Sequence, residues 1–389
     1  MTEREAASLL ALLPATGPAR VREAAARCGG FANLLAGRGE LPPSLAGEVA
    51  RWREEVARSR PALEERAARL AAAGIQILPL TDPLYPSLLR EIPDPPPWLF
   101  VRGRPEALSL PQIAIVGSRR ASRFGLAQAE RFAAQLAAGG FAITSGLAVG
   151  IDAAAHRGAL RTGVTVAVLG SGLARIYPRQ HRELAEEIVA GGGALVAELP
   201  PEAPPLPHHF PRRNRILSGL ALGVLVVEAA AQSGSLITAR HALEQGREVF
   251  AVPGSLHNPL SRGCHRLIRE GAVLVECAAD LVAELGGLLE HKAEELAPPA
   301  PTCRKARLGG CSATWRPVPP APTPSARRSA SIPRSSPRSW WIWSSRAGSN
   351  CAAASTTAPA ELTRATGLRR PAGWSSLSPS FRSRRPCIG

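Results

Sequence analysis

The sequence predicts an α/β protein with a doubly wound, mostly parallel sheet, preceded by a small helical domain. Two observations indicate this fold. From Gln112 onward, mostly apolar runs of four to six residues alternate with amphipathic segments, as expected for buried parallel strands covered by helices. Ahead of residue 70 the chain is instead rich in Ala, Leu, Arg and Glu with helical periodicity, which predicts several short helices.

The predicted helical domain, residues 1–70, is interrupted by prolines around Pro14 and Pro18 and again at Pro42 and Pro43. Its segment LLALLPATGPARVREAA resembles a helix–turn–helix of the helix-hairpin-helix or sterile-alpha-motif kind. Such a turn can hold a phosphate, but it more often only joins two packed helices. Residues 71–111 contain nine prolines and short extended pieces, so we expect a Pro-rich connector packed on the next domain.

Residues 112–295 form the predicted sheet domain. We expect strands near 113–116, 141–144, 164–169, 194–197, 223–227, 248–252 and 272–275, and helices around 125–138, 150–160, 179–190, 233–245 and 262–270. Ligands of such sheets bind beyond the carboxyl ends of the strands. Polar or glycine-rich residues follow five of the predicted strands, at Gly117–Arg120, Thr144–Gly146, Gly170–Gly172, Glu228 with Gln232–Ser235, and Pro253–Gly254.

The stretch Phe210–Arg240 resembles a phosphate-binding arrangement. Three arginines and an asparagine, Arg212–Arg215, are expected immediately before a helix, and Ser233–Ser235 open a later one. Small residues and free N–H groups at a helix start, with arginines nearby, favour anionic oxygen. Two alternatives remain for the serines, a simple helix cap or a nucleophile. The chain has no G-x-S-x-G elbow and no assigned base, which disfavours the nucleophile.

The loop Gly117–Arg120 stands where a dinucleotide fold carries its glycine fingerprint, but it is not G-x-G-x-x-G, and the second strand ends in no acid. We therefore expect no bound dinucleotide and no other cofactor. An arginine here suits a phosphate in the crevice, although a solvated arginine is the alternative. Asp152 and His156 share a helix face and could form a general base, but helix capping and loop anchoring explain them better.

The net charge of +16 belongs almost wholly to the end of the chain. Residues 296–389 carry fifteen Lys and Arg and one acid, whereas residues 1–295 carry 32 basic and 30 acidic groups. Seven scattered cysteines without a CxxC pair favour a reducing cytoplasm over disulfides or a metal site. We expect neither a secretory signal nor a membrane segment, because no apolar run approaches the required length.

Six motifs occur in one order: GSRRASRFG, TSGLAVGIDAAAH, VLGSGLARIYPRQH, FPRRNRILSGL, VLVVEAAAQSGSLITARHALEQGREVFAVPG and GCHRLIREGA. Together they resemble the DNA-processing protein A (DprA/Smf) family over about residues 75–290. The resemblance implies an extended Rossmann-like domain without catalytic residues that binds single-stranded DNA. It also implies a homodimer that protects incoming DNA and helps to load the RecA recombinase during natural transformation.

By position, the resemblance implies a DNA groove made of Arg119, Arg120, Ser145, Gly146, Phe210, Arg212, Arg213, Asn214, Arg215, Ser233, Gly234 and Ser235. Tyr177 is a second aromatic candidate beside Phe210. The chain departs from the family in having only one lysine before residue 296, Lys292, so arginine must replace lysine at the contacts. Two rival interpretations are a nucleotide (phosphoribo)hydrolase and a nucleotide sensor on a related fold. The hydrolase motif PGGxGTxxE is reduced here to Pro253-Gly254 and a separate Glu228.

Relatives often end in a winged-helix domain, whereas residues 296–389 form a low-complexity basic tail with five of the seven tryptophans. The run Trp340-Trp341-Ile342-Trp343 has nearly forced codons, which read two bases along as Val-Asp-Leu or Val-Asp-Met. GC-rich codons for 332–348 then give an amphipathic, acid-rich helix pattern. We hypothesise that a frameshift near 297–330 replaced a winged-helix domain; the alternative is a native basic tail that binds nucleic acid. The nucleotide sequence tests this hypothesis. The absence of an open alternate reading frame across residues 300–350 would exclude the frameshift.

Overall fold

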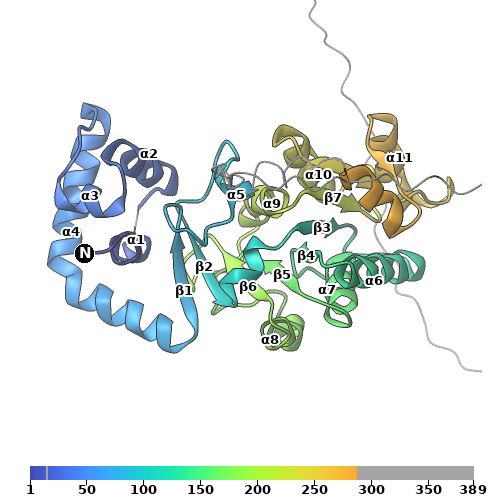
Figure 1. The fold of residues 1–389 in the computed structure, drawn as a ribbon, viewed down its shortest axis with the longest axis horizontal. Helices are drawn as coiled ribbons and strands as arrows, with labels where there is room; N and C mark the ends of the chain where they lie inside the picture. The colour runs from blue at the N-terminus through green and yellow to red at the C-terminus, as the bar shows by residue number, and fades with distance from the viewer. Residues whose placement is uncertain (15, 287–389) are drawn as a thin grey trace, which may run out of the picture. The chain divides into compact units, whose positions relative to one another are not determined.

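The structure, a computed structural model, describes residues 1–14 and 16–286 (Figure 1). The predicted tail, with its hypothesised frameshift, lies outside the described residues. The helices are α1 (Glu3–Leu12), α2 (Pro18–Cys28), α3 (Phe31–Ala36), α4 (Pro43–Ala72), α5 (Ser87–Arg90), α6 (Arg123–Ala138), α7 (Ile151–Leu160), α8 (Arg182–Ala190), α9 (His209–Leu220), α10 (Ser235–Glu244) and α11 (Arg262–Arg269), with short 3₁₀ turns at Pro105–Ser109, Arg179–His181 and Pro259–Ser261. The strands are β1 (Ile75–Pro79), β2 (Trp98–Gly103), β3 (Gln112–Val116), β4 (Ala142–Ser145), β5 (Thr165–Val168), β6 (Ala194–Ala197), β7 (Gly223–Val226), β8 (Glu248–Ala251) and β9 (Val273–Leu274).

A single sheet carries all these strands in the order β1-β2-β6-β5-β4-β3-β7-β8-β9. β1 and β2 are antiparallel to each other, β2 is antiparallel to β6, and the remaining pairs are parallel. From β3 the chain adds β4, β5 and β6 on one side and then returns to add β7 on the other. The predicted doubly wound, mostly parallel sheet is therefore confirmed, and its topological switch point lies between β3 and β7.

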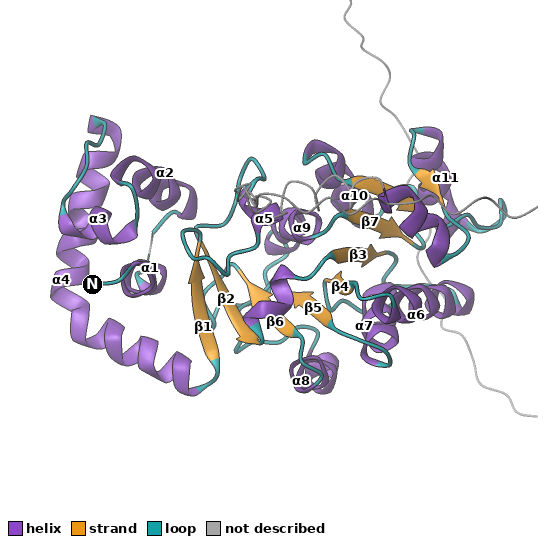
Figure 2. Ribbon diagram, viewed as in Figure 1, coloured by secondary structure: helices purple, strands orange, loops and turns teal. Residues whose placement is uncertain are grey.

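Both faces of the central strands are buried, which explains their uninterrupted apolar runs. In β3, Ala114 and Val116 pack in one cluster with residues of α9, α10 and α11, while Ile113 and Ile115 pack in another with α6 and α7. α8 and the helical segment share a third cluster with β1, β2 and β6. Helices thus cover the sheet from both sides (Figure 2).

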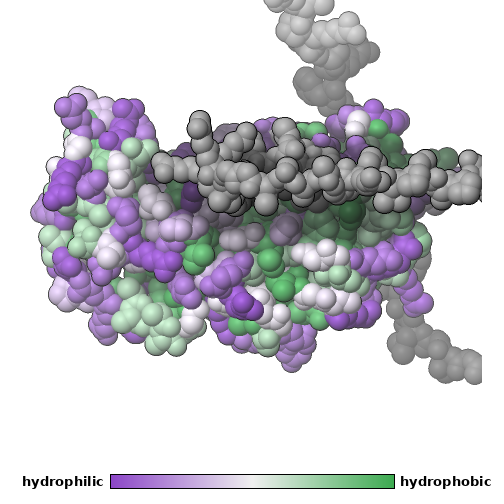
Figure 3. Space-filling model, in the orientation of Figure 1, coloured by the Kyte–Doolittle hydropathy of each residue, from purple (hydrophilic) through white to green (hydrophobic). Residues whose placement is uncertain are grey.

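The first four helices form the predicted helical segment. A capping box of Thr2 and Glu5 begins α1, and Pro18 begins α2, where its missing N–H costs nothing. The expectation of only short helices is wrong for α4, which continues over 30 residues in spite of Pro61. Its buried residues recur along one face, and burial of that face outweighs the one hydrogen bond that Pro61 removes. Hydrophilic residues gather on the outer side of α4 and on α6 (Figure 3).

The segment expected as a connector, residues 71–111, contributes β1 and β2 to the sheet. Pro79 ends β1, six prolines lie between β1 and β2, and Pro105 and Pro111 follow β2, so none removes a ladder hydrogen bond from a strand interior. The boundaries at residues 70 and 111 remain a prediction. Among the described residues, no helix is long and apolar enough to cross a membrane.

Candidate functional site

A cleft of about 510 Å³ opens at the switch point, beyond the carboxyl ends of β3 and β7. Three segments line most of it: the loop after β3, the first turns of α9 and the start of α10. Seven of the predicted site residues meet there, namely Arg119, Phe210, Arg213, Asn214, Ser233, Gly234 and Ser235. The other five, Arg120, Ser145, Gly146, Arg212 and Arg215, do not line the cleft.

Arg119 and two aromatic rings form the outer wall of the cleft. The Arg119 guanidinium carbon lies 5.6 Å from the centre of the Phe210 ring, and the Tyr177 ring lies 5.7 Å from the same ring. A β-carbon at Gly170 would come within 2.7 Å of the Phe210 ring, so the ring fits only beside glycine. Arg119 is exposed and Tyr177 is 45% exposed. This wall thus offers a cation and aromatic faces to a ligand.

Arg213, by contrast, supports the floor of the cleft from inside. Its guanidinium donates to the carbonyl oxygens of Val168 and Gly146, the latter at 3.0 Å. A β-carbon at Gly146 would lie 2.5 Å from the guanidinium, so glycine makes room for it. Burial lowers the pKa of Arg213 to about 10, and the side chain still carries its charge at neutral pH.

Asp152 holds the same loop from the other side. Its carboxylate accepts hydrogen bonds from the N–H groups of Gly146 and Ala148, at 3.1 and 3.4 Å. Between them Leu147 adopts φ +58°, and its carbonyl accepts a 2.8 Å hydrogen bond from His181 Nδ1. Burial raises the pKa of Asp152, although Arg213 opposes the shift. These contacts agree with loop anchoring, the favoured interpretation of Asp152.

His156 is fully buried and contacts β5 rather than the cleft. Its Nδ1 lies 2.7 Å from Thr165 Oγ1, whose own proton goes to the Ile143 carbonyl. Nδ1 therefore carries the imidazole proton, and Nε2 has no partner among the described residues. Burial, with His181 and Arg213 nearby, lowers the pKa of His156 to about 3. No hydrogen bond joins Asp152 and His156 in the described structure, which disfavours a general-base pair.

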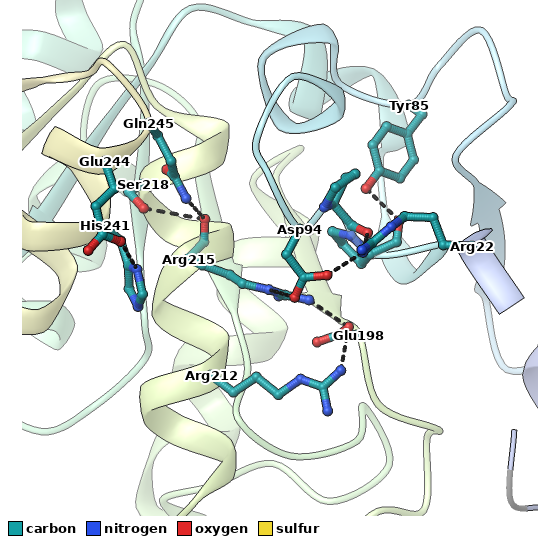
Figure 4. A network of polar contacts seen from close by, with 12 residues as sticks. Arg22, Tyr85, Asp94, Glu198, Arg212, Arg215, Ser218, His241, Glu244 and Gln245 are labelled. Carbon is teal, nitrogen blue, oxygen red and sulfur yellow. Dashed lines mark hydrogen bonds and ion pairs between the residues drawn. The ribbon is translucent and has the colours of Figure 1, made fainter. Parts of the chain in front are cut away.

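Arg212–Arg215 belong to α9, so the expectation that they precede a helix is wrong. Pro211 lies in the first helical turn, where a proline is tolerated. The i,i+3 spacing turns Arg212 and Arg215 toward the same carboxylate: Glu198 Oε1 accepts from Arg212 at 3.2 Å and from Arg215 at 2.8 Å. Asp94 accepts from Arg215 at 3.1 Å and also from Arg22 of α2 (Figure 4).

The three arginines of α9 therefore differ in accessibility. The Arg215 side chain is 9% exposed and bonded to two carboxylates, and Arg213 is buried on carbonyl oxygens. The Arg212 side chain is 46% exposed and shares Glu198 with Arg215. Of these three, Arg212 is the most accessible to an external anion.

Ser145 and the serines of α10 are held by internal contacts. The buried Ser145 hydroxyl donates to the Ile115 carbonyl at 2.6 Å. The Ser233 and Ser235 hydroxyls lie 2.6 Å apart, and the Ser235 N–H donates to Ser233 Oγ at 3.3 Å. The Ser233 N–H is bonded to the Ala230 carbonyl, which leaves the exposed Gly234 N–H without an acceptor among the described residues. Among the described residues, neither the Ser233 nor the Ser235 hydroxyl contacts a histidine or a carboxylate, which disfavours a serine nucleophile.

Sequence reasoning missed some residues of the cleft. Ser118 belongs to the strand-end group Gly117–Arg120, but it is not among the residues predicted to contact DNA. Pro205 and Pro207 come from the loop between β6 and α9, and no pattern in that loop indicates a site. No group of three or more His, Cys, Asp or Glu side chains is placed to hold a metal ion within residues 1–14 and 16–286.

Comparison with known proteins identifies the family. The model of the family described as DNA recombination-mediator protein A matches residues 76–286. Protein Smf of Escherichia coli K12 is 50% identical over 227 residues, which are 58% of this chain and 61% of that protein. The DNA processing protein DprA of Streptococcus pneumoniae R6 is 46% identical over 206 residues, 53% of this chain and 72% of that protein.

The fold agrees as well. The X-ray structure of DNA processing protein A from Streptococcus pneumoniae matches with a TM-score of 0.58 at 37% identity, covering 73% of this chain and 98% of that one. The family model spans more than half of the present chain. The protein therefore belongs to the DNA recombination-mediator protein A family, DprA/Smf.

Proposed function

We propose that this protein binds single-stranded DNA along the cleft, protects it and helps to load it with RecA recombinase during natural transformation. One observation carries the proposal: Arg119 in the cleft and its exposed neighbour Arg120 have no acidic partner within residues 1–14 and 16–286. Arg119 and Arg120 form no ion pair with any described residue. Many exposed arginines of the helical segment, such as Arg60 with Glu64, do have one. Unpaired cations beside a cleft favour an anionic ligand.

A neighbouring pocket supports a polymeric ligand. This pocket, of about 360 Å³, is lined by Arg175, Arg179 and Arg182 and shares Tyr177 and Pro205 with the cleft. None of its three arginines forms an ion pair with the described residues. Two adjoining cationic hollows suit a chain of phosphates better than a single nucleotide.

Single strands are favoured over duplexes by the aromatic rings between the two hollows. Tyr177 and Phe210 offer ring faces on which unpaired bases can stack, and paired bases are not free to do so. Phosphate contacts by arginine and stacking are both sequence-tolerant, so we expect weak sequence preference and strong salt dependence.

A binding role without catalysis is favoured by the charged groups of the cleft. Asp152 and Arg213 are occupied in holding the 146–148 loop. Glu228, the residue that the rival hydrolase would need, is buried and does not line the cleft. The nucleotide hydrolase and nucleotide sensor therefore have no observation in their favour.

Fluorescence anisotropy with labelled oligo-dT tests the proposal on the full chain. Arg119→Ala should weaken binding about tenfold and reduce the slope of log K against log salt by about one. Arg60→Ala is the matched control, because this exposed arginine of α4 is paired with Glu64 and does not line the cleft. Both variants keep the basic tail, so the difference between their affinities for oligo-dT reports the contribution of the cleft. Equal affinities of wild type and Arg119→Ala would exclude this site.

The partners of the proposed function need separate measurements. Nucleoside monophosphates should neither be turned over nor compete at concentrations that saturate a small-nucleotide sensor. RecA filament growth on single-stranded DNA should start sooner with the wild-type protein than with Arg119→Ala. Sedimentation at the concentration of the binding assay should show the expected homodimer, and a monomer there would remove that part of the proposal.

A further inference from the structure

The segment that carries Arg119 and its exposed neighbour Arg120 is short and is held by several hydrogen bonds. We call residues 117–122, between β3 and α6, the arginine loop, because they include Arg119 and Arg120. At one side of the loop the Ser118 carbonyl accepts from the Ile151 N–H at 3.2 Å. Among the described residues, its other hydrogen bonds to distant parts of the chain all go to one residue, Glu228.

Glu228 follows β7, the strand that pairs in parallel with β3. Its main-chain carbonyl accepts from the Ser118 N–H at 2.7 Å. Its carboxylate accepts from the Ser122 N–H at 2.9 Å and from the Ser122 hydroxyl at 2.6 Å. Asn258 adds a longer contact at 3.4 Å. Glu228 thus holds the arginine loop at both of its ends.

The surroundings of this carboxylate are shaped to receive it. A β-carbon at Gly125 would overlap the Glu228 carboxylate, and one at Gly117 would lie 2.9 Å from its carbonyl oxygen. The Ser122 hydroxyl also accepts from the Gly125 N–H at 3.0 Å, so Ser122 and Glu228 together cap the start of α6. A negative charge is stabilised at this end of a helix.

Within the part of the chain that the structure describes, no cation pairs with Glu228 to explain its burial. It is 4% exposed and forms no ion pair with the described residues. Its charge is instead met by N–H and O–H donors, most of them from the arginine loop and the adjoining helix start. A buried carboxylate this close to an anion site opposes anion binding by its charge alone. Any contribution of Glu228 to anion binding must therefore come from its contacts with the arginine loop and not from its charge.

We propose that Glu228 is a positioning residue for DNA binding, which acts through the arginine loop. By fixing Ser118 and Ser122, it keeps Arg119 at the Phe210 ring and Arg120 beside the cleft before DNA arrives. A loop that is ordered in advance loses less conformational entropy on binding. This inference rests on the proposed function, and it concerns a residue that does not line the cleft.

The test uses Glu228→Gln in the full chain, with anisotropy against labelled oligo-dT. Glutamine keeps the shape but turns an N–H₂ donor, instead of a second acceptor, toward Ser122. Positioning predicts binding about tenfold weaker than wild type. Charge alone predicts the opposite, tighter binding, because a negative group is removed next to a polyanion site. The sign of the change therefore separates the two explanations.

A double-mutant cycle shows through which residues Glu228 acts. If it acts through the loop arginines, Glu228→Gln should have no weakening effect in the Arg119→Ala/Arg120→Ala background. A general loss of folding would instead weaken binding by the same factor in both backgrounds. Should Glu228→Gln fail to fold, Ser122→Ala serves in its place, since it removes the hydroxyl donor and leaves Glu228 intact.

Two results overturn the inference. One is wild-type or tighter binding by folded Glu228→Gln while Arg119→Ala still binds weakly. The other is a Glu228→Gln effect of unchanged size without the two arginines. If wild type and Arg119→Ala bind oligo-dT equally, the proposed function itself has failed, so the two failures are distinguishable.

Discussion

The guanidinium of Arg213 fills the space that a side chain would occupy at Gly146, and it donates a 3.0 Å hydrogen bond to the Gly146 carbonyl. A residue of the basic cluster thus serves as an internal support for the loop that follows β4. Arg215 is likewise buried, between Glu198 and Asp94. Two of the three clustered arginines build the cleft, and the exposed ones around it remain available for an anion.

Gly146→Ala should destabilise the protein by displacing that guanidinium. Three Arg213 atoms would lie within 2.5–2.7 Å of the new β-carbon, closer than real contacts allow. Overpacking of this kind costs about 2 kcal/mol. Urea unfolding measures it. Gly47→Ala in α4 is the matched control, because nothing lies within 4 Å of its β-carbon and alanine favours a helix, so this variant should gain a little stability. Equal stabilities of the two variants would contradict the packing argument.

Arg212→Ala and Arg215→Ala should separate binding from folding. Arg215→Ala removes the buried partner of Glu198, which then keeps only the half-exposed Arg212, and loss of one partner of a buried ion pair costs about 3 kcal/mol. Arg212 is half exposed, so its removal should change the free energy of unfolding by less than about 1 kcal/mol. Urea unfolding measures both.

Binding of oligo-dT should show the reverse order for folded protein. Arg212→Ala should bind several-fold more weakly and lower the salt slope, because it removes an accessible cation. In buffer without urea, and at a temperature at which the variant remains folded, Arg215→Ala should bind with nearly wild-type affinity. Weak binding by folded Arg215→Ala, with normal binding by Arg212→Ala, would reverse the assignment.

Gly170→Ala tests whether the position of the Phe210 ring matters for binding. The new β-carbon would meet the ring at 2.7–3.2 Å, and the half-buried ring can move away. We therefore expect a stability change below about 1 kcal/mol, but several-fold weaker oligo-dT binding, as for Phe210→Ala. Anisotropy and thermal unfolding check the two parts. Unchanged affinity in Gly170→Ala would mean that the ring position does not contribute.

The parallel strands could be predicted because burial on both faces leaves uninterrupted apolar runs, such as Val224–Val227, in the sequence. The start of α9 could not be predicted, because Pro211 and the arginines beside it resemble a loop when their partners Glu198 and Asp94 are unseen. The role of Arg213 depends on carbonyl oxygens far away in the chain, and no local pattern encodes them. Glu228 can be recognised in the sequence as a polar residue at a strand end. Its hydrogen bonds to Ser122 of the arginine loop are tertiary contacts, so the sequence alone does not reveal them.

His156 should make stability depend on pH in the weakly acidic range. Its folded pKa is about 3 because burial, with His181 and Arg213 nearby, disfavours the imidazolium, and the unfolded value is about 6.5. Between these values the unfolded chain binds the extra proton. The stabilisation is therefore fully present above about pH 6.5 and declines as the pH falls toward 3. From pH 7.5 to 5.0 this one group should remove about 2 kcal/mol of the free energy of unfolding.

Urea unfolding of wild type and His156→Leu at both pH values measures this contribution. The variant loses the hydrogen bond to Thr165 and is less stable at pH 7.5, but its stability should fall by about 2 kcal/mol less on acidification. Carboxylates that titrate in the same range are common to both proteins and cancel in the comparison. His257→Gln, which alters an exposed loop residue, should follow the wild-type curve. Parallel curves for wild type and His156→Leu would show that the buried ring accepts a proton without unfolding, against the tautomer fixed by Thr165.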